Sequence, residues 1–563
     1  MNSSSEKIEL EFECLFSKRA SKIKPGLERI KSALSFFPFL LNPSDDNGKN
    51  VFGIQEFKSL GSAVANLHKF DEDIFSPKQN RKPGNKAASK RPYRILVGGT
   101  NGKGTTSGML FHLLSNAGYK VGLFTSPHIC HFRERIQVTG ENIDDLSLSS
   151  LLNDIRGILP KQLYDDMSFF EVSTVMASLA FFHHKCDVEI YEVGLGGRWD
   201  STNIFDPDLS IITSIGYDHQ AWLGETLEEI LNDKLYIGRS GKPLLWGEPC
   251  LGKDRQGLLE ILTQRSTTDG FLIHNICELA KKEGNSFSLH LPAIKNIYFD
   301  FPKWFDTSAQ VIRDNFLLSF SAMIYFLSDI EGKSKDCTVS ISRNALKKFA
   351  GPETHWPPSL IGRFQPLTVK ESLSGKVFPM IVDVCHNIDS VLKLIENINK
   401  LAKDQAAEAQ GIRAVKPYMH TEDAFRRDQT HGTDFNRELC LSGKKKLPGI
   451  VSIAKDKEVV KLLQHLRSVL DPIVVFKMDN DRSLTREQIS PLAENMHYAD
   501  SFSAAWRFAT EHFDVFQTPW VVCGSFFAVG EVLNYFDAFP KKPQMQTALL
   551  GSFTSEYPLD VFS

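Results

Sequence analysis

Short apolar runs that end in glycine or serine alternate with longer amphipathic stretches along the first half of the chain. The apolar runs are continuous enough for strands buried on both faces, and they are RILVGGT, YKVGLFTS, CDVEIYEVGLGG and LSIITSIG. Helical periodicity marks the segments GLERIKSALSFFPFLL, FEVSTVMASLAFFHH and TLEEILNDKLYIG. Strands that alternate with helices in this way predict a doubly wound, mainly parallel α/β sheet.

The alternation restarts near residue 360. Further strands are predicted at MIVDVCHN, GIVSIAK, PIVVFKM and WVVCGS, with helices such as DKEVVKLLQHLRSVL between them. We therefore predict an N-terminal domain over residues 1–358 and a C-terminal Rossmann-like α/β domain over residues 359–563. Residues 72–92 and 402–447 are polar, charged and poor in periodic apolar positions, so both are predicted to be surface insertions.

Composition narrows the class of protein. Of the 563 residues, 42% are hydrophobic and 24% are charged, which is typical of a globular chain of two or more domains. A net charge of -3 gives no electrostatic reason to expect nucleic acid or membrane partners. The nine cysteines form no C-x-x-C pair, which argues against structural zinc and secreted disulfide frameworks. No signal peptide or bilayer-length apolar run is evident, so we expect a cytoplasmic location.

A glycine-rich turn follows the first predicted strand, in RILVGGTNGKGTTSGML. A strand that runs into such a turn and then into a helix gathers backbone N–H groups around one point, where phosphate oxygens are natural ligands. The predicted phosphate-binding residues are Gly99, Thr100, Asn101, Gly102, Lys103, Gly104, Thr105 and Thr106. The alternative is a turn that merely connects a strand to a helix.

The segment GTNGKGTT resembles the phosphate loop of the folylpolyglutamate synthase and dihydrofolate synthase family of the Mur ligase superfamily, in which a glycine follows the lysine. Other motifs follow in the family's order: LFTSPHI, ERIQVTGE, FFEVST, YEVGLGGRWDSTN, SIGYDHQAWLGETLEEI, GRFQ, DVCHN and VCGSFFAVGEVL. The resemblance implies Mur ligase architecture and an ATP- and magnesium-dependent ligase. Such a ligase adds L-glutamate to a folate, to dihydropteroate or to both, through an acyl phosphate, and a monomer is expected.

Carried over residue by residue, the resemblance places ligands of a first magnesium ion at Ser126 and Glu192 and a ligand of a second at His219. It also implies catalytic roles for Lys103, Glu192, His219 and Lys234. A carboxylate is the most natural of these partners for a hard cation. The family's lysine at the position of Lys234 is carbamylated, and here Leu235 and Tyr236 replace the usual Ala-Gly after it. The alternatives are a solvated lysine at a helix end for Lys234 and a structural histidine for His219.

The second domain supplies Arg363, Asp383 and His386, which the resemblance places at the nucleotide across the interdomain cleft; an interdomain ion pair is the alternative. Asn315 matches a position near the adenine, and Ser525 is a family-typical residue at a strand end. Val384 and Cys385 replace the family's Gly-Ala, which predicts a less tightly fixed loop. Phe169 and Phe170 could pack on the flat rings of a folate or belong to the core.

Three questions of function stay open on the sequence alone. Nothing in it separates addition of the first glutamate to dihydropteroate from extension of a folate. A Mur-type peptide ligase is one alternative, although such enzymes typically carry a further N-terminal domain. A nucleotide-binding regulatory protein with a decayed active site is another, which the altered DKLYI and DVCHNI segments favour.

Overall fold

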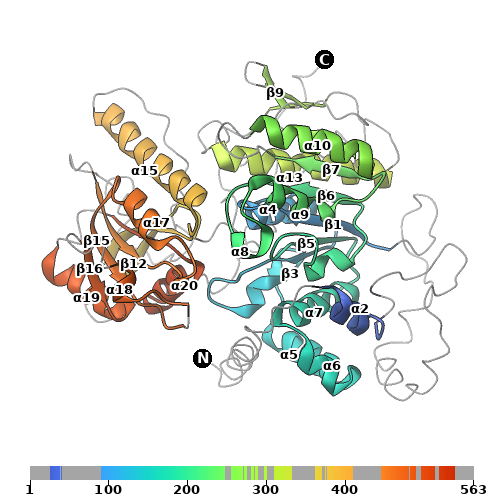
Figure 1. Ribbon diagram of the computed structural model, residues 1–563, viewed down its shortest axis with the longest axis horizontal. Helices are drawn as coiled ribbons and strands as arrows, with labels where there is room; N and C mark the ends of the chain where they lie inside the picture. The colour runs from blue at the N-terminus through green and yellow to red at the C-terminus, as the bar shows by residue number, and fades with distance from the viewer. Residues whose placement is uncertain are drawn as a thin grey trace, which may run out of the picture.

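The described part of the chain contains two large sheets and one small three-stranded sheet (Figure 1). The computed structural model describes residues 26–37, 40, 91–247, 255–270, 272–275, 280–283, 286–289, 297–300, 310–331, 362–370, 375, 377–409, 446–480, 482–489, 496–513 and 519–538. In Figure 1 the body built on the C-terminal sheet lies to the left of the body built on the N-terminal sheet. Within these residues no helix is long and apolar enough to cross a membrane.

The N-terminal sheet has eight strands in the order β4-β3-β2-β5-β1-β6-β7-β8. The strands are β1 (Tyr93–Gly98), β2 (Val121–Phe124), β3 (Ile136–Val138), β4 (Glu141–Asn142), β5 (Val188–Glu192), β6 (Leu209–Ile212), β7 (Pro243–Trp246) and β8 (Leu272–Asn275). The strands β2, β5, β1, β6, β7 and β8, neighbours in this order, pair in parallel. At one edge of the sheet β3 pairs antiparallel with β2, and β4 pairs antiparallel with β3. The doubly wound, mainly parallel prediction is confirmed.

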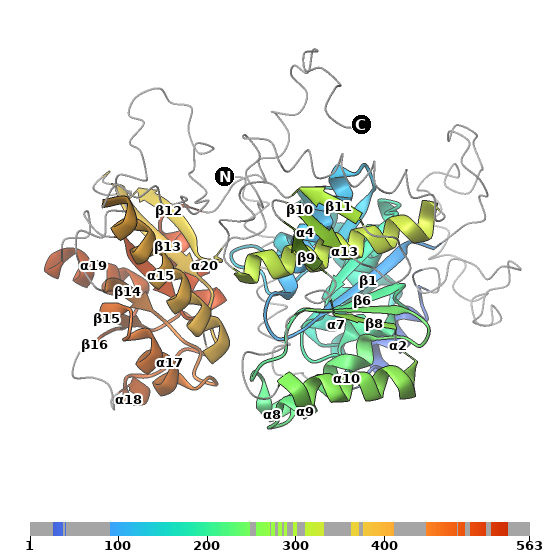
Figure 2. The same cartoon turned by 90° about the horizontal axis from the view of Figure 1, so that it is seen from above.

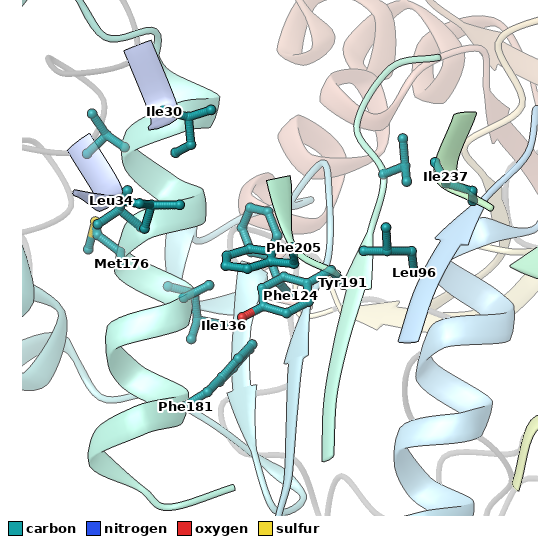
Figure 3. Packing of buried hydrophobic residues seen from close by; sticks show 14 of the residues in the cluster. Ile30, Leu34, Leu96, Phe124, Ile136, Met176, Phe181, Tyr191, Phe205 and Ile237 are labelled. Atoms are coloured by element: carbon teal, nitrogen blue, oxygen red, sulfur yellow. The ribbon is translucent and has the colours of Figure 1, made fainter. Parts of the chain in front are cut away.

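Helices cover both faces of this sheet (Figure 2). One face packs against α4 (Lys103–Asn116) and α13 (Gln310–Glu331), and the other packs against α2 (Glu28–Leu34), α5 (Asp145–Ile158), α7 (Phe169–His183), α9 (Leu227–Lys234) and α10 (Arg255–Asp269). Successive strand side chains divide between the two cores, as Ile95 and Leu96 do. Figure 3 shows Phe124, Tyr191 and Phe205 together at the centre of one core, with Ile30, Leu34 and Met176 of the covering helices grouped to one side.

The C-terminal sheet has six strands in the order β12-β13-β17-β14-β15-β16, and only the β12–β13 pairing is antiparallel. Its strands are β12 (Gln365–Lys370), β13 (Val377–Asp383), β14 (Leu447–Val451), β15 (Leu470–Phe476), β16 (Met496–Ala499) and β17 (Trp520–Cys523). The helices α15 (Ile388–Ala409) and α17 (Val459–Leu466) pack on one face, and α19 (Phe502–His512) and α20 (Phe526–Tyr535) on the other. The predicted second α/β sheet is therefore present.

Some details differ from the sequence-based expectation. The predicted N-terminal helix is short, since α2 ends at Leu34, and α15 continues to Ala409, eight residues into the predicted insertion 402–447. A small antiparallel sheet of β9 (Ala280–Glu283), β10 (Ser286–Leu289) and β11 (Ile297–Asp300) was not predicted. The domain boundary at 358/359 and most of both insertions lie outside the described residues, so they stay predictions.

A buried ion pair joins the two central strands β1 and β5. Arg94, which is 2% exposed, donates from Nε to Glu189 Oε2 at 2.8 Å and from Nη2 to the Leu40 carbonyl. Tyr191 also donates its hydroxyl to Glu189, at 3.2 Å. This network ties the N-terminal segment to the sheet below the phosphate loop.

Replacing Arg94 with methionine should destabilise this sheet by about 3–5 kcal/mol, because Glu189 would be left buried and unpaired. The measurement is urea unfolding of the wild type, of Arg94→Met and of the double variant Arg94→Met/Glu189→Gln. The double variant should recover part of the loss, since it removes the unpaired charge. A single variant as stable as the wild type would contradict this role for the pair.

Candidate active site

The predicted phosphate loop lies where β1 ends and α4 begins, and two of its glycines are required by the backbone. Gly99 has φ +138°, and a Cβ atom there would lie 2.0 Å from Thr213 Oγ1. Gly102 has φ +88°, and a Cβ atom there would lie 2.6 Å from Asn315 Oδ1. Any other residue would be strained and would clash, so these glycines fix the path of the loop.

Hydrogen bonds hold the first half of the loop to the segment that follows β6. Thr100 donates its N–H to Ser214 O at 2.8 Å, and Asn101 donates its N–H to Ser214 Oγ at 3.0 Å. Thr213 donates its hydroxyl to Asn101 O at 2.7 Å. The second half is different: Gly102, the N-cap of α4, offers no side chain, and no described residue accepts from the first amides of the helix. Free amides at a helix start form an anion-binding site, which a simple connecting turn does not need.

The side chains of the loop point in two directions. Lys103 folds back and donates from Nζ to Gly99 O and Thr100 O, both at 3.1 Å. Withdrawal from bulk water lowers its pKa, and the nearby Glu192 opposes that shift. Thr105 is buried, and Thr106 donates to Asn315 Oδ1 at 3.1 Å. Asn315 of α13 therefore lies against the phosphate loop itself.

Glu192 ends β5 beside the loop and is 3% exposed. Its Oε2 accepts from the Thr125 hydroxyl and from the Ser126 N–H at 3.0 Å, whereas Oε1 has no hydrogen-bond partner among the described residues. Both carboxylate oxygens would lie 3.4 Å from a Cβ atom added at Gly104. Burial raises the pKa of Glu192, and the Lys103 ammonium opposes the shift.

The donor set fits magnesium bound with phosphate. The structure brings Ser126 and Glu192 together at the start of α4. In the part of the chain that the structure describes, no three His, Cys, Asp or Glu side chains converge on one point. Magnesium prefers a few protein oxygens completed by phosphate and water, so one free carboxylate oxygen beside a phosphate loop is suited to it.

Lys234 is the last residue of α9 and reaches the same loop. It is 4% exposed, and its Nζ donates to Gly99 O at 3.0 Å. Burial lowers its pKa to about 7, and the Lys103 ammonium acts in the same direction. The alternative of a solvated lysine is therefore wrong. Leu235 is buried and Tyr236 is 40% exposed, so these bulkier neighbours leave the lysine at the loop.

His219 lies at the N-cap of α8 (Gln220–Leu223) with φ +52°, and its side chain is 38% exposed. Withdrawal of the ring from solvent lowers the pKa of His219 to about 4, and the Lys457 ammonium acts in the same direction. The imidazole is therefore neutral at pH 7. Its ring forms no hydrogen bond with any described residue, and its Nε2 lies 3.7 Å from Asp218 Oδ2. A satisfied structural histidine does not fit this geometry, whereas a neutral imidazole can serve as a metal ligand.

Asp218 joins the two sheets. Its carboxylate accepts from Lys457 Nζ and from Asn387 Nδ2 at 3.2 Å, and His386 Nε2 lies 3.5 Å from Oδ2. Although burial acts against ionisation, these partners hold the pKa of Asp218 well below its usual range. Asn387 also exchanges side-chain hydrogen bonds with Asn101 of the phosphate loop, at 3.1 and 3.3 Å. The DVCHN loop of the second domain therefore touches the phosphate loop directly.

The other residues predicted from the second domain are placed as follows. The Arg363 guanidinium carbon lies 4.8 Å from the centre of the Phe526 ring, and its electrostatic partners include Glu192 across the interface. Asp383 accepts from the N–H groups of Phe364 and Cys385, both at 2.8 Å. These bonds anchor the altered loop at Asp383, and the expectation of a less tightly fixed loop stays a prediction.

Three predicted residues have local roles. Ser525 is the N-cap of α20 and accepts from the Phe527 N–H at 3.2 Å. Phe169 is buried in the core beside α7, and the Phe170 ring would lie 2.6 Å from a Cβ atom added at Gly194. Both phenylalanines therefore belong at least partly to the core. The interdomain ion-pair alternative applies to His386, through Asp218.

Sequence reasoning missed Asp218, Asn387 and Lys457. The first two lie inside motifs that were quoted, next to His219 and His386, so their polarity beside a predicted ligand was a usable signal. Lys457 follows β14, in IAKDKEVV, where it reads as an ordinary solvated lysine. Only the packing of the two sheets shows that it meets Asp218.

Comparison with known proteins identifies relatives of this chain. Residues 97–243 match the Mur ligase middle domain. The chain is 32% identical over 338 residues to the dihydrofolate synthase/folylpolyglutamate synthase of Bacillus subtilis, covering 59% of this chain and 73% of that protein. It is 28% identical over 460 residues to the Escherichia coli protein of the same name, covering 79% and 87%. A Yersinia pestis folylpolyglutamate synthase/dihydrofolate synthase solved with AMPPNP and a manganese ion has the same fold, with a TM-score of 0.60, 22% identity and coverage of 95% and 98%.

Proposed function

The chain belongs to the dihydrofolate synthase/folylpolyglutamate synthase family, and from this premise we propose that it is an ATP-dependent ligase that joins L-glutamate to dihydropteroate, to a folate or to both. One observation carries the proposal for this chain. The free amides of α4, the Lys103 ammonium, the Glu192 carboxylate and the buried Lys234 meet at one phosphate loop. Such a convergence serves phosphoryl transfer, which depends on positioning and charge neutralisation.

The reaction proceeds in two steps. The γ-phosphoryl group of ATP is transferred to the acceptor carboxylate, which gives an acyl phosphate and ADP. The amino group of glutamate then attacks the acyl carbon, the carbon–oxygen bond to phosphate breaks, and an amide and inorganic phosphate result. The chain holds the phosphates through the amides of α4 and Lys103, and it orients the nucleotide through Gly99–Thr106, Asn315, Arg363, Asp383 and His386.

One magnesium ion, when bound by Ser126 and Glu192, and a second, when bound by His219, would neutralise charge on the phosphates. Lys234, if carbamylated by carbon dioxide, would add a second anionic group beside the metal. Its lowered pKa supplies a neutral amine at physiological pH, which can attack carbon dioxide, form a carbon–nitrogen bond and release a proton to give a carbamate. The modification is an optional part of the proposal.

Closure between the two sheets completes the site in this proposal. The Asp218 cluster and the Asn101–Asn387 pair connect the two sheets beside the phosphate loop. We further propose a cytoplasmic monomer that acts on small molecules without nucleic acid or membrane partners. The near-neutral charge of -3 and the small size of every reactant support this view.

Replacing Lys457 with methionine should lower kcat/KM for ATP by about tenfold or more, because Asp218 would lose its closest cation at the interface. Lys461 offers a matched control, since its partner Glu458 is exposed and on its own helix turn. Steady-state kinetics of Lys457→Met and Lys461→Met check the prediction. Equal kinetic constants for the two variants would contradict the proposal that Asp218 helps to close the two sheets on each other.

The experiment that tests the function is incorporation of labelled L-glutamate with dihydropteroate or tetrahydrofolate as the acceptor. Incorporation into dihydropteroate alone would identify a dihydrofolate synthase, incorporation into tetrahydrofolate alone a folylpolyglutamate synthase, and incorporation into both a bifunctional enzyme. Incorporation into a UDP-linked peptidoglycan precursor alone would favour a Mur-type peptide ligase. Binding of ATP without any amide product would favour the regulatory protein.

A further inference from the structure

Arg135 is a buried cation whose donors are largely unused. It is 5% exposed, and its Nε donates to His128 Nδ1 at 2.7 Å. Its guanidinium carbon lies 5.1 Å from the centre of the Phe169 ring. No described residue accepts from its two Nη groups, and none forms an ion pair with it within 4.0 Å. A buried charge normally has a hydrogen-bonded partner, because its removal from water is costly.

The two nearby carboxylates are already engaged. Glu134 accepts from the N–H groups of Ile129 and Cys130, both at 2.8 Å, and from that of His131. Glu192 accepts from Thr125 and Ser126. Both attract the guanidinium at longer range, yet burial still lowers the pKa of Arg135 to about 10. Among the described residues no carboxylate is therefore left to pair with Arg135, which leaves its Nη groups available to an external anion.

Arg135 also lies at the edge of the sheet that carries the candidate active site. Its carbonyl accepts from the Thr125 N–H at 2.9 Å, and the Thr125 hydroxyl donates to Glu192. Because the guanidinium occupies His128 Nδ1, the imidazole carries its proton on Nε2. Arg135 thus keeps two Nη groups without a described acceptor, close to the Phe169 ring and one strand away from the predicted magnesium ligands.

We propose that Arg135, positioned by His128 and Phe169, binds a carboxylate of the acceptor substrate. This inference rests on the proposed function and names the residue that recognises the acceptor. A guanidinium offers two parallel N–H groups, which match the two oxygens of a carboxylate, and the Phe169 ring, 5.1 Å from the guanidinium carbon, holds it in position. The carboxylate has two sources: the reacting group, which both acceptors have, or the neighbouring α-carboxylate, which only a folate has.

The test compares Arg135→Lys and Arg135→Met with Arg133→Lys. Arg133 is two residues away and pairs with Asp145 at 3.3 Å, so it is a control for disturbance of the same short helix. Calorimetry measures binding of dihydropteroate and of its carboxamide, and kinetics measure KM for dihydropteroate and tetrahydrofolate. Thermal unfolding and KM for ATP show whether each variant keeps its fold and its nucleotide site.

We expect the Arg135 variants to bind dihydropteroate or tetrahydrofolate at least about tenfold more weakly, with KM for ATP unchanged. Loss with both acceptors, but not with the carboxamide, identifies the reacting carboxylate. Loss with tetrahydrofolate alone identifies the α-carboxylate. Unchanged binding of both acceptors, or equal loss for dihydropteroate and its carboxamide, would overturn the inference.

Failure of this inference can be told apart from failure of the proposed function. If the wild type incorporates glutamate and the Arg135 variants bind both acceptors normally, only the inference fails. If the wild type binds dihydropteroate through Arg135 but forms no amide, the proposed ligase activity fails while the carboxylate site stands. If the wild type binds neither acceptor, both are overturned.

Discussion

Replacing Lys234 with methionine is expected to abolish glutamate addition and to raise the stability of the protein. The ammonium is buried beside Lys103, and a fall in its pKa from 10.5 to about 7 corresponds to about 5 kcal/mol against the charged form. Methionine removes that cost and fills similar space, while the hydrogen bond to Gly99 O, about 1 kcal/mol, is lost. A net gain of about 4 kcal/mol at pH 7 is therefore expected.

The difference in stability between Lys234→Met and the wild type is expected to change with pH. Between pH 7 and 10.5 the unfolded chain binds more protons at Lys234 than the folded chain does, so the lysine's contribution to stability rises with pH over that window. The stability advantage of Lys234→Met should shrink as the pH rises from 7 to 10. Thermal unfolding in buffer depleted of carbon dioxide measures both effects. A variant less stable than the wild type at pH 7 would contradict the burial argument.

The same variant separates the lysine from its modification. If Lys234 acts as a carbamate, removal of carbon dioxide should lower wild-type turnover, and bicarbonate should restore it. Lys234→Met should stay inactive in either condition, because it has no amine to modify. Full turnover by Lys234→Met would exclude the carbamate from the mechanism.

The second large effect is expected at Lys103. Replacing it with methionine should lower kcat by a factor on the order of 10²–10³, because one fixed cation at the transferring phosphoryl group is lost. Stability should change little, since Nζ donates only to carbonyls of its own loop. Single-turnover release of ADP checks the rate, and nucleotide binding by calorimetry is the control. Normal turnover would show that the phosphate loop does not perform the transfer.

Much of the fold could be predicted because the signal was local. Continuous apolar runs marked β1, β5, β6 and β14, since parallel strands are buried on both faces. Short or edge strands such as β3 and β4 could not be found, because two or three residues carry no period. The end of α15 was also missed, since exposed polar helix residues resemble a loop in the sequence.

Some residues of the site could likewise be predicted from the sequence, and others could not. The phosphate loop could be predicted because Gly99 and Gly102 have conformations that only glycine tolerates. The spacing of the glycines in the sequence therefore indicates the path of the loop. Lys234 and Lys457 look alike in the sequence, and only tertiary packing buries the first at Gly99 and brings the second to Asp218. Arg135 lies inside the quoted segment ERIQVTGE, but the sequence did not single it out, because an unused buried donor is defined by what surrounds it.

The most direct test of the central claim follows one oxygen atom. The acceptor is labelled with ¹⁸O in its carboxylate and incubated with the protein, ATP, magnesium and L-glutamate, and the inorganic phosphate is analysed by mass spectrometry. Transfer through an acyl phosphate predicts one ¹⁸O atom in each phosphate released, with one amide and one ADP formed alongside it. Unlabelled phosphate, or ADP release that does not depend on the acceptor, would contradict the account.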